Sequence, residues 1–481
     1  MIYKESLALL TDLYQLTMAY GYWKAKIQDR KAVFHLIFRK KPFQGMFALA
    51  AGLEYVIDFI QNFHYSQSDL DYLHSLKTSS GKPLFEEPFL DYLSHLSFSL
   101  DIDAPPEGTI LFPHEPLIRV KGPILQAQLL ESPLLNMLNF QTLIATKASR
   151  ICYEAYPADV VEFGMRRAQG MDGAISASRA AYIGGCEGTS HLLAGKLFHI
   201  PVRGTQAHSW VMAFEKEEEA FSIFNEILPE NSFMLIDTYD SIEGVKKAIR
   251  MAKKKKKKLF GVRLDSGDLA YLSGEVRKIL DREGFFDTKI MASNELDEYL
   301  IRDLKQQGAK IDVYGVGTHL VTGKDQPALD GVYKLSAISS ETGSWQYKVK
   351  ISEQSAKTTT PGILQIRRFS EKGRFFADAI FDENSKKPSS WTLVDVCDPA
   401  LQVSIPKDLS FQDLLVPIFR SGKCVYRKPT LLEIRTFAKK ELKLLPPTVR
   451  RLVNPQRYVA GFEKSLFETK RALIKKLRKS E

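Results

Sequence analysis

The sequence contains few cysteines and no long hydrophobic run, and each of these two features excludes a class of protein. No Cys-x-x-Cys pair occurs in the 481 residues, so neither a disulfide framework nor a zinc ribbon is expected. No stretch reaches the roughly 18 apolar residues that cross a bilayer, and the N-terminus lacks a cleavable targeting pattern. We therefore expect a cytoplasmic protein, in a reducing compartment, with no membrane partner. The four cysteines are Cys152, Cys186, Cys397 and Cys424.

Several common catalytic motifs are also missing. There is no Gly-x-Gly-x-x-Gly after a strand, no His-Glu-x-x-His, no Gly-x-Ser-x-Gly and no Cys or His cluster with metal-ligand spacing. The segment Gly317–Lys324 misses the phosphate-loop spacing by one residue, and Asp325 stands where Ser or Thr is required. These absences exclude a Walker-type ATP site, a Rossmann dinucleotide site and a zinc peptidase, and no metal-ligand residues are predicted.

The net charge of +10 is confined to the C-terminal tail. Residues 421–481 hold 17 of the 67 Lys and Arg but only five of the 57 acidic side chains, so the rest of the chain is about neutral. The run Lys253–Lys258 follows an amphipathic pattern, and cations at the C-terminal end of a helix complement its dipole. No aromatic residues interleave the run as in a single-strand binding surface. A nucleic-acid partner is therefore not favoured.

Composition and patterning divide the chain into three parts. With 44% hydrophobic and 26% charged residues, the chain can bury two or three sizeable cores. Residues 1–140 mix helical patterns with short strands and predict an α+β domain, in which the prolines of 107–120 favour edge strands. A helical pattern leads into residues 141–340, where strands and helices alternate. Residues 341–481 predict a C-terminal cap that partly completes the N-terminal domain and ends in a basic helical tail.

The regular alternation in the middle part predicts parallel strands joined by crossover helices. A barrel and a doubly wound sheet both have this rhythm. The expected strands are Val160–Phe163, Phe198–Val202, Phe233–Ile236, Phe260–Val262, Lys289–Met291 and Ile311–Tyr314. The expected helices are Gly173–Tyr182, Ile242–Lys253, Leu269–Glu283 and Asp297–Gln307.

Polar residues or glycines lie at or just past the C-terminal end of nearly every expected strand. In a barrel the loops after many strands converge on one mouth, whereas an open sheet draws its site from the few strands at a switch point. Polar ends on six successive strands therefore favour a barrel. In chain order the residues are Glu162, Arg166, Arg167, Thr205, His208, Asp237, Asp240, Arg263, Asp265, Ser293, Asn294, Gly315, Gly317 and Thr318.

The residue types at these ends indicate an anionic substrate. Gly315–Thr318 can present backbone N–H groups to an anion. Forked donors for carboxylate or phosphate are added by Arg166, Arg167 and Arg263. Singly, each side chain, and also His208, fits a structural ion pair or hydrogen bond. Jointly they indicate a phosphorylated sugar with an anionic co-substrate. The carboxylates that can bind sugar hydroxyls or hold Mg²⁺ through water are Asp237, Asp240 and Asp265.

Seven segments together make the chain resemble the nicotinate phosphoribosyltransferases. They are Leu10–Met18, Glu162–Gly170, Gly204–Ser209, Ile236–Asp240, Gly261–Asp268, Gly315–Thr318 and Asn454–Tyr458. The resemblance implies a type II phosphoribosyltransferase fold, in which an irregular parallel α/β barrel is joined to an α+β N-terminal domain and a C-terminal cap. It also implies a homodimer with active sites at the subunit interface.

The implied reaction joins nicotinate to 5-phosphoribosyl 1-diphosphate and gives nicotinate mononucleotide and diphosphate, a salvage step of NAD biosynthesis. Mg²⁺ is the implied cofactor, and ATP is the implied co-substrate, hydrolysed through a phosphohistidine. His208 falls on the phosphorylated position, which is chemically suitable because neutral imidazole is a nucleophile near neutral pH. The other residues with an expected catalytic role are Arg263 and Asp265.

The resemblance also implies binding roles. Tyr14 matches an aromatic residue that stacks on the pyridine ring from the partner subunit, and Arg166 matches an arginine on the ring's other side. Thr205 and Arg263 match residues lining the nicotinate pocket. The residues that resemble the phosphate-binding loop are Gly317 and Thr318, and the further expected substrate-binding residues are Asp237 and Asp240.

One segment departs from the family pattern. Relatives often have Gly-Gly-Phe-Asp-x-Thr-Ser-Asn where this chain has Cys186, Glu187 and His191, which leaves the local pocket contacts open. A nicotinamide or quinolinate phosphoribosyltransferase on the same fold is the nearest alternative, but Ser190 and the arginines suit a carboxylate better than an amide. A non-catalytic basic nucleic-acid-binding protein is a further alternative that only the tail supports.

Overall fold

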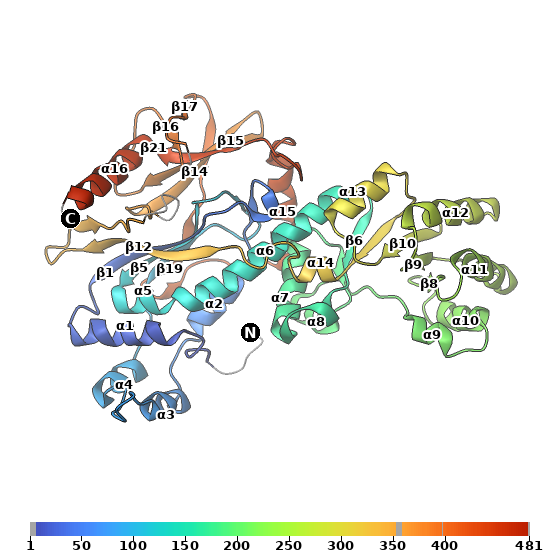
Figure 1. Cartoon of the computed structure of the whole chain (residues 1–481), viewed down its shortest axis with the longest axis horizontal. Helices are drawn as coiled ribbons and strands as arrows, with labels where there is room; N and C mark the ends of the chain where they lie inside the picture. Colours follow the sequence, from blue (N-terminus) through green and yellow to red (C-terminus); the bar gives the residue numbers. More distant parts are fainter. Residues whose placement is uncertain (1–5, 353–357, 397, 480–481) are drawn as a thin grey trace. The chain divides into compact units, whose positions relative to one another are not determined.

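The chain folds into two compact units (Figure 1). The computed structural model describes residues 6–352, 358–396 and 398–479. The first unit combines the described residues up to Leu143 with those from Ala328 onward, and the second unit is Ile144–Pro327. Helix α6 (Glu131–Ala155) passes from the first unit into the second. Residues 328–340, assigned to the middle domain from the sequence, lie in the first unit.

The first unit is built on a seven-stranded antiparallel sheet. In sheet order its strands are β13 (Trp345–Tyr347), β12 (Gly331–Ser339), β1 (Lys31–Phe38), β5 (Pro116–Pro123), β3 (Asp101–Ala104), β19 (Val416–Arg420) and β20 (Lys423–Cys424). The prediction of edge strands at 107–120 is wrong for β5, which lies between β1 and β3. Its prolines are its first and last residues, so the interior of the strand keeps its hydrogen-bond donors.

A second sheet and several helices complete this unit. The second sheet has the order β17 (Gln402–Ser404), β16 (Thr392–Asp395), β21 (Val459–Glu463), β15 (Arg374–Asp382), β14 (Leu364–Glu371) and β18 (Ser410–Asp413), and β2 (Ala48–Leu49) pairs with β4 (Ile110–Leu111). The helices include α1 (Leu13–Lys24), α2 (Leu53–Gln61), α3 (Gln67–Ser75), α4 (Glu87–Ser94), α5 (Ile124–Leu129), α15 (Leu431–Leu444) and α16 (Lys464–Lys479).

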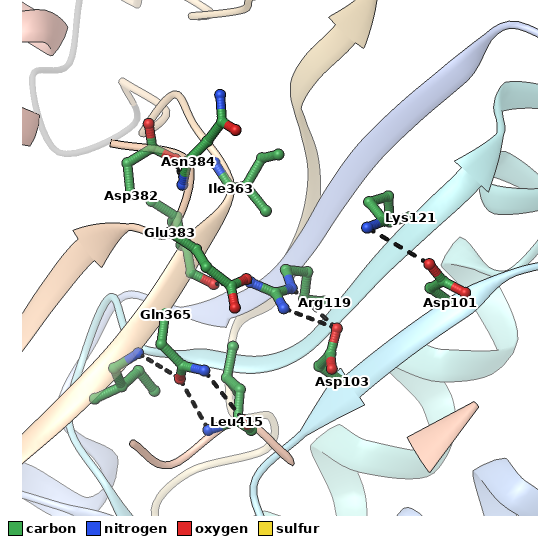
Figure 2. Close-up of polar contacts among 12 residues, drawn as sticks. Asp101, Asp103, Arg119, Lys121, Ile363, Gln365, Asp382, Glu383, Asn384 and Leu415 are labelled. Atoms are coloured by element: carbon green, nitrogen blue, oxygen red, sulfur yellow. Dashed lines mark hydrogen bonds and ion pairs between the residues drawn. The ribbon is translucent and has the colours of Figure 1, made fainter. Parts of the chain in front are cut away.

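A buried arginine links the two large sheets. Figure 2 shows Arg119 of β5 beside Asp103 of β3. Arg119 Nη2 donates to Asp103 Oδ2 at 2.9 Å, and Nη1 donates to the carbonyl oxygen of Leu364 in β14 at 3.0 Å. Nearby, Gln365 Oε1 accepts a hydrogen bond from the Leu415 N–H at 3.0 Å. Each of these buried polar groups has a hydrogen-bond partner, and the bond from Arg119 to Leu364 joins the first sheet to the second.

Arg368 of β14 is the centre of a fully buried ion cluster. It donates to both oxygens of Asp378, to Glu441 Oε2 at 3.1 Å and to the Ile110 carbonyl oxygen at 2.7 Å. Replacing Arg368 with methionine is expected to lower the free energy of unfolding of this unit by about 3–5 kcal/mol, because two carboxylates lose their cationic partner in a dry interior. Urea denaturation followed by circular dichroism measures the loss.

The exposed pair between Lys24 and Glu86 provides the matched control. Its Nζ to Oε2 distance is 2.6 Å, and both side chains are about half exposed. Because water screens such a pair, Lys24→Met is expected to leave the denaturation midpoint unchanged. Equal midpoint shifts in Lys24→Met and Arg368→Met would contradict the importance of the buried cluster.

The second unit is built on a sheet of six parallel strands. In sheet order they are β7 (Gly188–Thr189), β6 (Asp159–Glu162), β11 (Val313–Val316), β10 (Lys289–Ser293), β9 (Gly261–Leu264) and β8 (Phe233–Leu235). Its helices include α7 (Gly170–Ile183), α8 (Leu192–Phe198), α10 (Glu217–Ile227), α11 (Ser241–Lys255), α12 (Leu269–Arg282) and α13 (Glu298–Gln306). In chain order the last of these strands is β11, and it pairs with the first, β6. This is the strand order of the predicted irregular α/β barrel, with a gap between β7 and β8.

The gap in the barrel lies between β7 and β8. The predicted strand 198–202 is not formed, because Phe198 ends α8 and Pro201 has no N–H to donate to a ladder. Val202 makes a single parallel bridge to the end of β7. Across the gap, Gln206 Nε2 donates to the Phe233 carbonyl oxygen of β8 at 3.3 Å. A side chain therefore replaces one strand pairing at this point of the barrel.

Helix α11 ends inside the lysine run, as the charge pattern predicts. Lys256 forms its left-handed C-cap with a φ of 51°. Lys255 Nζ lies 3.0 Å from Glu226 Oε1, and Lys253 pairs with Glu283. Acidic neighbours therefore neutralise part of the run. None of the helices in the described residues is long and apolar enough to cross a membrane.

Candidate active site

Arg263 is the centre of the polar cluster at the carboxyl ends of the parallel strands. It is the third residue of β9 and only 9% exposed. Its Nε donates to Ser293 Oγ at 2.8 Å, at the end of β10. Its Nη1 donates to Thr205 Oγ1 at 2.7 Å, and its Nη2 donates to Asp265 Oδ1 at 2.7 Å. One guanidinium therefore positions three side chains from three segments of the barrel.

Two carboxylates lie next to this arginine. Asp237 Oδ2 accepts hydrogen bonds from the Asp265 N–H and from Ser266 Oγ, both at 2.7 Å. Asp237 Oδ1 is buried and has no hydrogen-bond partner among the residues that the structure describes. Burial acts to raise the pKa of the Asp265 carboxyl, but the Arg263 guanidinium and the Ser293 hydroxyl outweigh it and hold that pKa below its usual value. Asp265 is therefore a carboxylate at neutral pH.

His208 begins the short helix α9 (His208–Met212) and lies between two polar groups. Its Nδ1 is 3.2 Å from Thr238 Oγ1, and its Nε2 is 3.8 Å from Asp265 Oδ2. The side chain is 40% exposed, so a substrate in solution can reach the imidazole. A hydroxyl fixes one ring nitrogen, and the other is available for chemistry.

The glycine loop after β11 leads into helix α14 (Thr318–Val321). Gly317 precedes the helix, and Thr318 Oγ1 donates to Glu295 Oε1 at 3.1 Å. Glu295 Oε2 also pairs with His319 Nε2 at 2.9 Å. Asn294 and Glu295 have φ values of 105° and 40°, a strained conformation that ordinarily persists only where the surroundings enforce it. Neither Glu295 nor His319 belongs to a recognisable motif, so no sequence pattern predicts this contact.

Glu162 shapes the neighbouring loop instead of facing a ligand. It is completely buried, and its carboxylate accepts hydrogen bonds from the Gly164 N–H, Ser178 Oγ at 2.8 Å and Thr189 Oγ1 at 2.5 Å. These donors come from the β6 loop, α7 and β7. Every bond is internal, so Glu162 holds three segments of the barrel together at its carboxyl edge. Ser178, inside a helix of small residues, offered no sequence signal for this contact.

Three expected binding residues lie outside this cluster. Arg166 is exposed on the short turn Met165–Arg167. Asp240 caps α11, where its Oδ1 accepts from the Glu243 N–H at 2.7 Å. Tyr14 lies on α1 of the first unit and is 48% exposed. Among the described residues, no three His, Cys, Asp or Glu side chains form a group that could hold a metal ion.

Solved structures with the same architecture define the class of protein. A crystal structure of human nicotinic acid phosphoribosyltransferase matches with a TM-score of 0.81 and 29% identity, covering 96% of this chain and 99% of that one. A nicotinate-nucleotide pyrophosphorylase from Pyrococcus furiosus shares the fold with a TM-score of 0.68, over 91% of this chain and 95% of that one, at 24% identity. The chain is thus an enzyme of the type II phosphoribosyltransferase class.

Sequence comparison then specifies the family. The description "Nicotinate phosphoribosyltransferase (NAPRTase) family" matches residues 158–387, and the N-terminal and C-terminal domains of the same enzymes match residues 9–139 and 365–470. The Bacillus subtilis nicotinate phosphoribosyltransferase is 40% identical, over 97% of this chain and 95% of its own length. The human enzyme is 33% identical over 94% of this chain and 93% of its own. The chain belongs to the nicotinate phosphoribosyltransferase family.

Proposed function

We propose that the chain joins nicotinate to 5-phosphoribosyl 1-diphosphate in a salvage step of NAD biosynthesis, and that it couples this transfer to ATP hydrolysis through His208. The observation that carries the proposal is the Arg263 cluster, which unites Thr205, Asp265 and Ser293 at the strand ends. His208 lies beside Asp265 in the same cluster. The residues proposed to bind nicotinate therefore lie next to His208, the side chain suited to phosphorylation.

Arg263 and Thr205 are suited to capture the nicotinate carboxylate. Thr205 Oγ1 accepts a hydrogen bond from Arg263 and donates a long one, of 3.3 Å, to the Gln206 carbonyl oxygen, so rotation of the hydroxyl can redirect its proton to a carboxylate oxygen. The adjacent guanidinium adds positive charge, which makes that hydrogen bond stronger. Fixing the carboxylate orients the pyridine nitrogen for attack on C1 of the ribosyl group as diphosphate leaves.

Mg²⁺ fits this site as a partner of the diphosphate. Asp237 Oδ1, the buried carboxylate oxygen without a partner, is the kind of hard ligand that Mg²⁺ takes. Mg²⁺ is commonly held by one or two carboxylates together with substrate phosphates and water, so a protein-only cluster is not required. The ion would neutralise negative charge on the leaving diphosphate. Asp237 would hold it, while Arg263 keeps Asp265 in place.

ATP coupling requires a nucleophilic imidazole nitrogen. When His208 Nδ1 carries the proton and donates it to Thr238 Oγ1, the Nε2 lone pair can attack the γ-phosphorus of ATP. An N–P bond forms, the bond to the bridging oxygen breaks, and ADP leaves. Water later hydrolyses the N–P bond, regenerating the imidazole. The nearby Asp265 carboxylate stabilises the positive charge that develops on the ring.

A homodimer is the proposed assembly, with Tyr14 supplied to the partner's site. Four large apolar side chains on or just before α1 are more than a third exposed, which supports a protein contact there. They are Leu10, Leu13, Tyr14 and Met18. We also propose a cytoplasmic location, because the four cysteines form no Cys-x-x-Cys pair or disulfide framework and so fit a reducing compartment.

Substrate preference tests the proposed pocket. Nicotinate is expected to give a kcat/KM at least about 100-fold higher than nicotinamide, because an amide leaves the guanidinium and hydroxyl donors without a charged acceptor. Steady-state assays with nicotinate, nicotinamide and quinolinate, each with 5-phosphoribosyl 1-diphosphate and Mg²⁺, with and without ATP, measure the preference and the coupling. A higher kcat/KM for nicotinamide would refute the assignment.

A further inference from the structure

Two thiols meet between α6 and the loop that joins α7 to β7. Cys152 lies near the end of α6, and Cys186 lies two residues before β7. Their Sγ atoms are 3.9 Å apart. Cys186 is buried, with 1% of its surface exposed, whereas Cys152 is partly exposed. A reagent in solution therefore reaches Cys152 first, and Cys186 lies within contact distance of it.

Two glycines allow the loop to lie against α6. A Cβ atom on Gly184 would come within 2.5 Å of the Ala145 carbonyl oxygen. Gly185 has a φ of 121°, and a Cβ atom there would lie 3.3 Å from Cys152 Cβ. An S–S bond is about 2.05 Å long, so the sulfur atoms must approach each other by somewhat less than 2 Å. Side-chain rotation and a small shift of the loop can supply that movement.

We propose that Cys152 and Cys186 form a reversible oxidation site, and that its disulfide lowers the transferase activity. A peroxide oxidises the Cys152 thiolate to a sulfenic acid: the O–O bond breaks, and one oxygen leaves as water after protonation. The Cys186 thiolate then attacks the Cys152 sulfur, which forms the S–S bond and releases a second water. Two thiols and one hydrogen peroxide thus give one disulfide and two waters, and a small dithiol reverses the oxidation.

Residues 184–187, the loop that contains Cys186, are linked through β7 to the hydrogen bonds of Glu162 at the carboxyl ends of the barrel strands. Cys186 leads directly into β7, where Thr189 Oγ1 donates to Glu162 at 2.5 Å. Glu162 also accepts from the Gly164 N–H, at the start of the loop that carries Arg166. A shift of the loop therefore displaces the hydrogen bonds that shape this edge. Because displacements of about 1 Å can cost up to about 100-fold in rate, a loss of roughly tenfold is expected in the oxidised enzyme.

The test uses the full chain with Cys397→Ser and Cys424→Ser, which keeps only the proposed pair. After brief treatment with hydrogen peroxide, the remaining thiols are alkylated and the protein is digested without reduction. Mass spectrometry is expected to find the peptides of Cys152 and Cys186 linked, while kcat/KM for nicotinate falls about tenfold and recovers with dithiothreitol. In the same background, Cys186→Ser is expected to form no link and to show no reversible loss.

Three results would overturn the proposal. They are a Cys152 sulfinate without linked peptides, a complete linkage that leaves kcat/KM unchanged, and an equal reversible loss of activity in Cys186→Ser. The effect on activity rests on the proposed transferase function, but formation of the disulfide does not. If the reduced enzyme does not use nicotinate at all, the proposed function fails, and the linkage is still scored by mass spectrometry.

Discussion

Replacing Arg263 with alanine is expected to lower kcat/KM for nicotinate by at least about 10³-fold. The guanidinium positions Thr205, Ser293 and Asp265 at once, so its removal disorders substrate capture and the carboxylate beside His208 together. It also leaves Asp265 without its strongest cationic neighbour. Steady-state kinetics measures the loss, and circular dichroism verifies that the variant is folded.

Two further arginine variants separate geometry from charge. Arg263→Lys keeps a positive charge but has no fork to hold three acceptors, so a loss of at least about 100-fold is expected. Arg250→Ala removes an arginine from α11 that is 56% exposed and pairs with Glu218, and it is expected to retain full activity. Near-normal kcat/KM in Arg263→Lys would mean that charge alone matters and would refute the positioning role.

Replacing His208 with alanine is expected to abolish the stimulation of turnover by ATP while leaving ATP-independent product formation. The imidazole is the proposed phosphoryl acceptor, and the residues that hold nicotinate are different ones. The ratio of kcat with ATP to kcat without ATP should therefore fall to about one, while the basal rate changes by less than about tenfold. Assays at saturating nicotinate with and without ATP measure this ratio.

Labelling provides a second readout for His208. ATP carrying ³²P in the γ-phosphate is expected to label the unmodified chain with an acid-labile phosphate and to leave His208→Ala unlabelled. His95→Ala is the control, because that imidazole is 78% exposed on the first unit, and it should retain both label and stimulation. ATP stimulation that survives in His208→Ala would exclude the phosphohistidine route.

Local sequence signals located most elements of the barrel within a few residues. Asp268 and Asp297 accept hydrogen bonds from backbone N–H groups in the first turn of α12 and of α13, and both helices begin within one residue of the predicted position. The buried strands β9 and β10 are short apolar runs that local patterning also detects. Propensity and capping act between residues close in sequence, which makes such features readable from the chain alone.

The errors lie where distant partners decide the structure. β7 has only two residues and exists because it pairs with β6, whereas the apolar segment 198–202 does not form a strand because Pro201 breaks the ladder. β12 belongs to the sheet of the first unit because it pairs along β1, some 300 residues earlier in the chain. No local pattern contains that pairing.

By itself, the sequence determined the chemistry available to this protein: an arginine, carboxylates, a histidine and a glycine loop placed after successive strands, together with the family they indicate. Only the tertiary structure decided which of these side chains touch. Arg263 contacts Thr205, 58 positions away, and Ser293, 30 positions away, whereas Asp240 caps a helix and Arg166 lies exposed. The physical reason is that such contacts depend on the order of strands around the barrel, which long-range pairing and packing set.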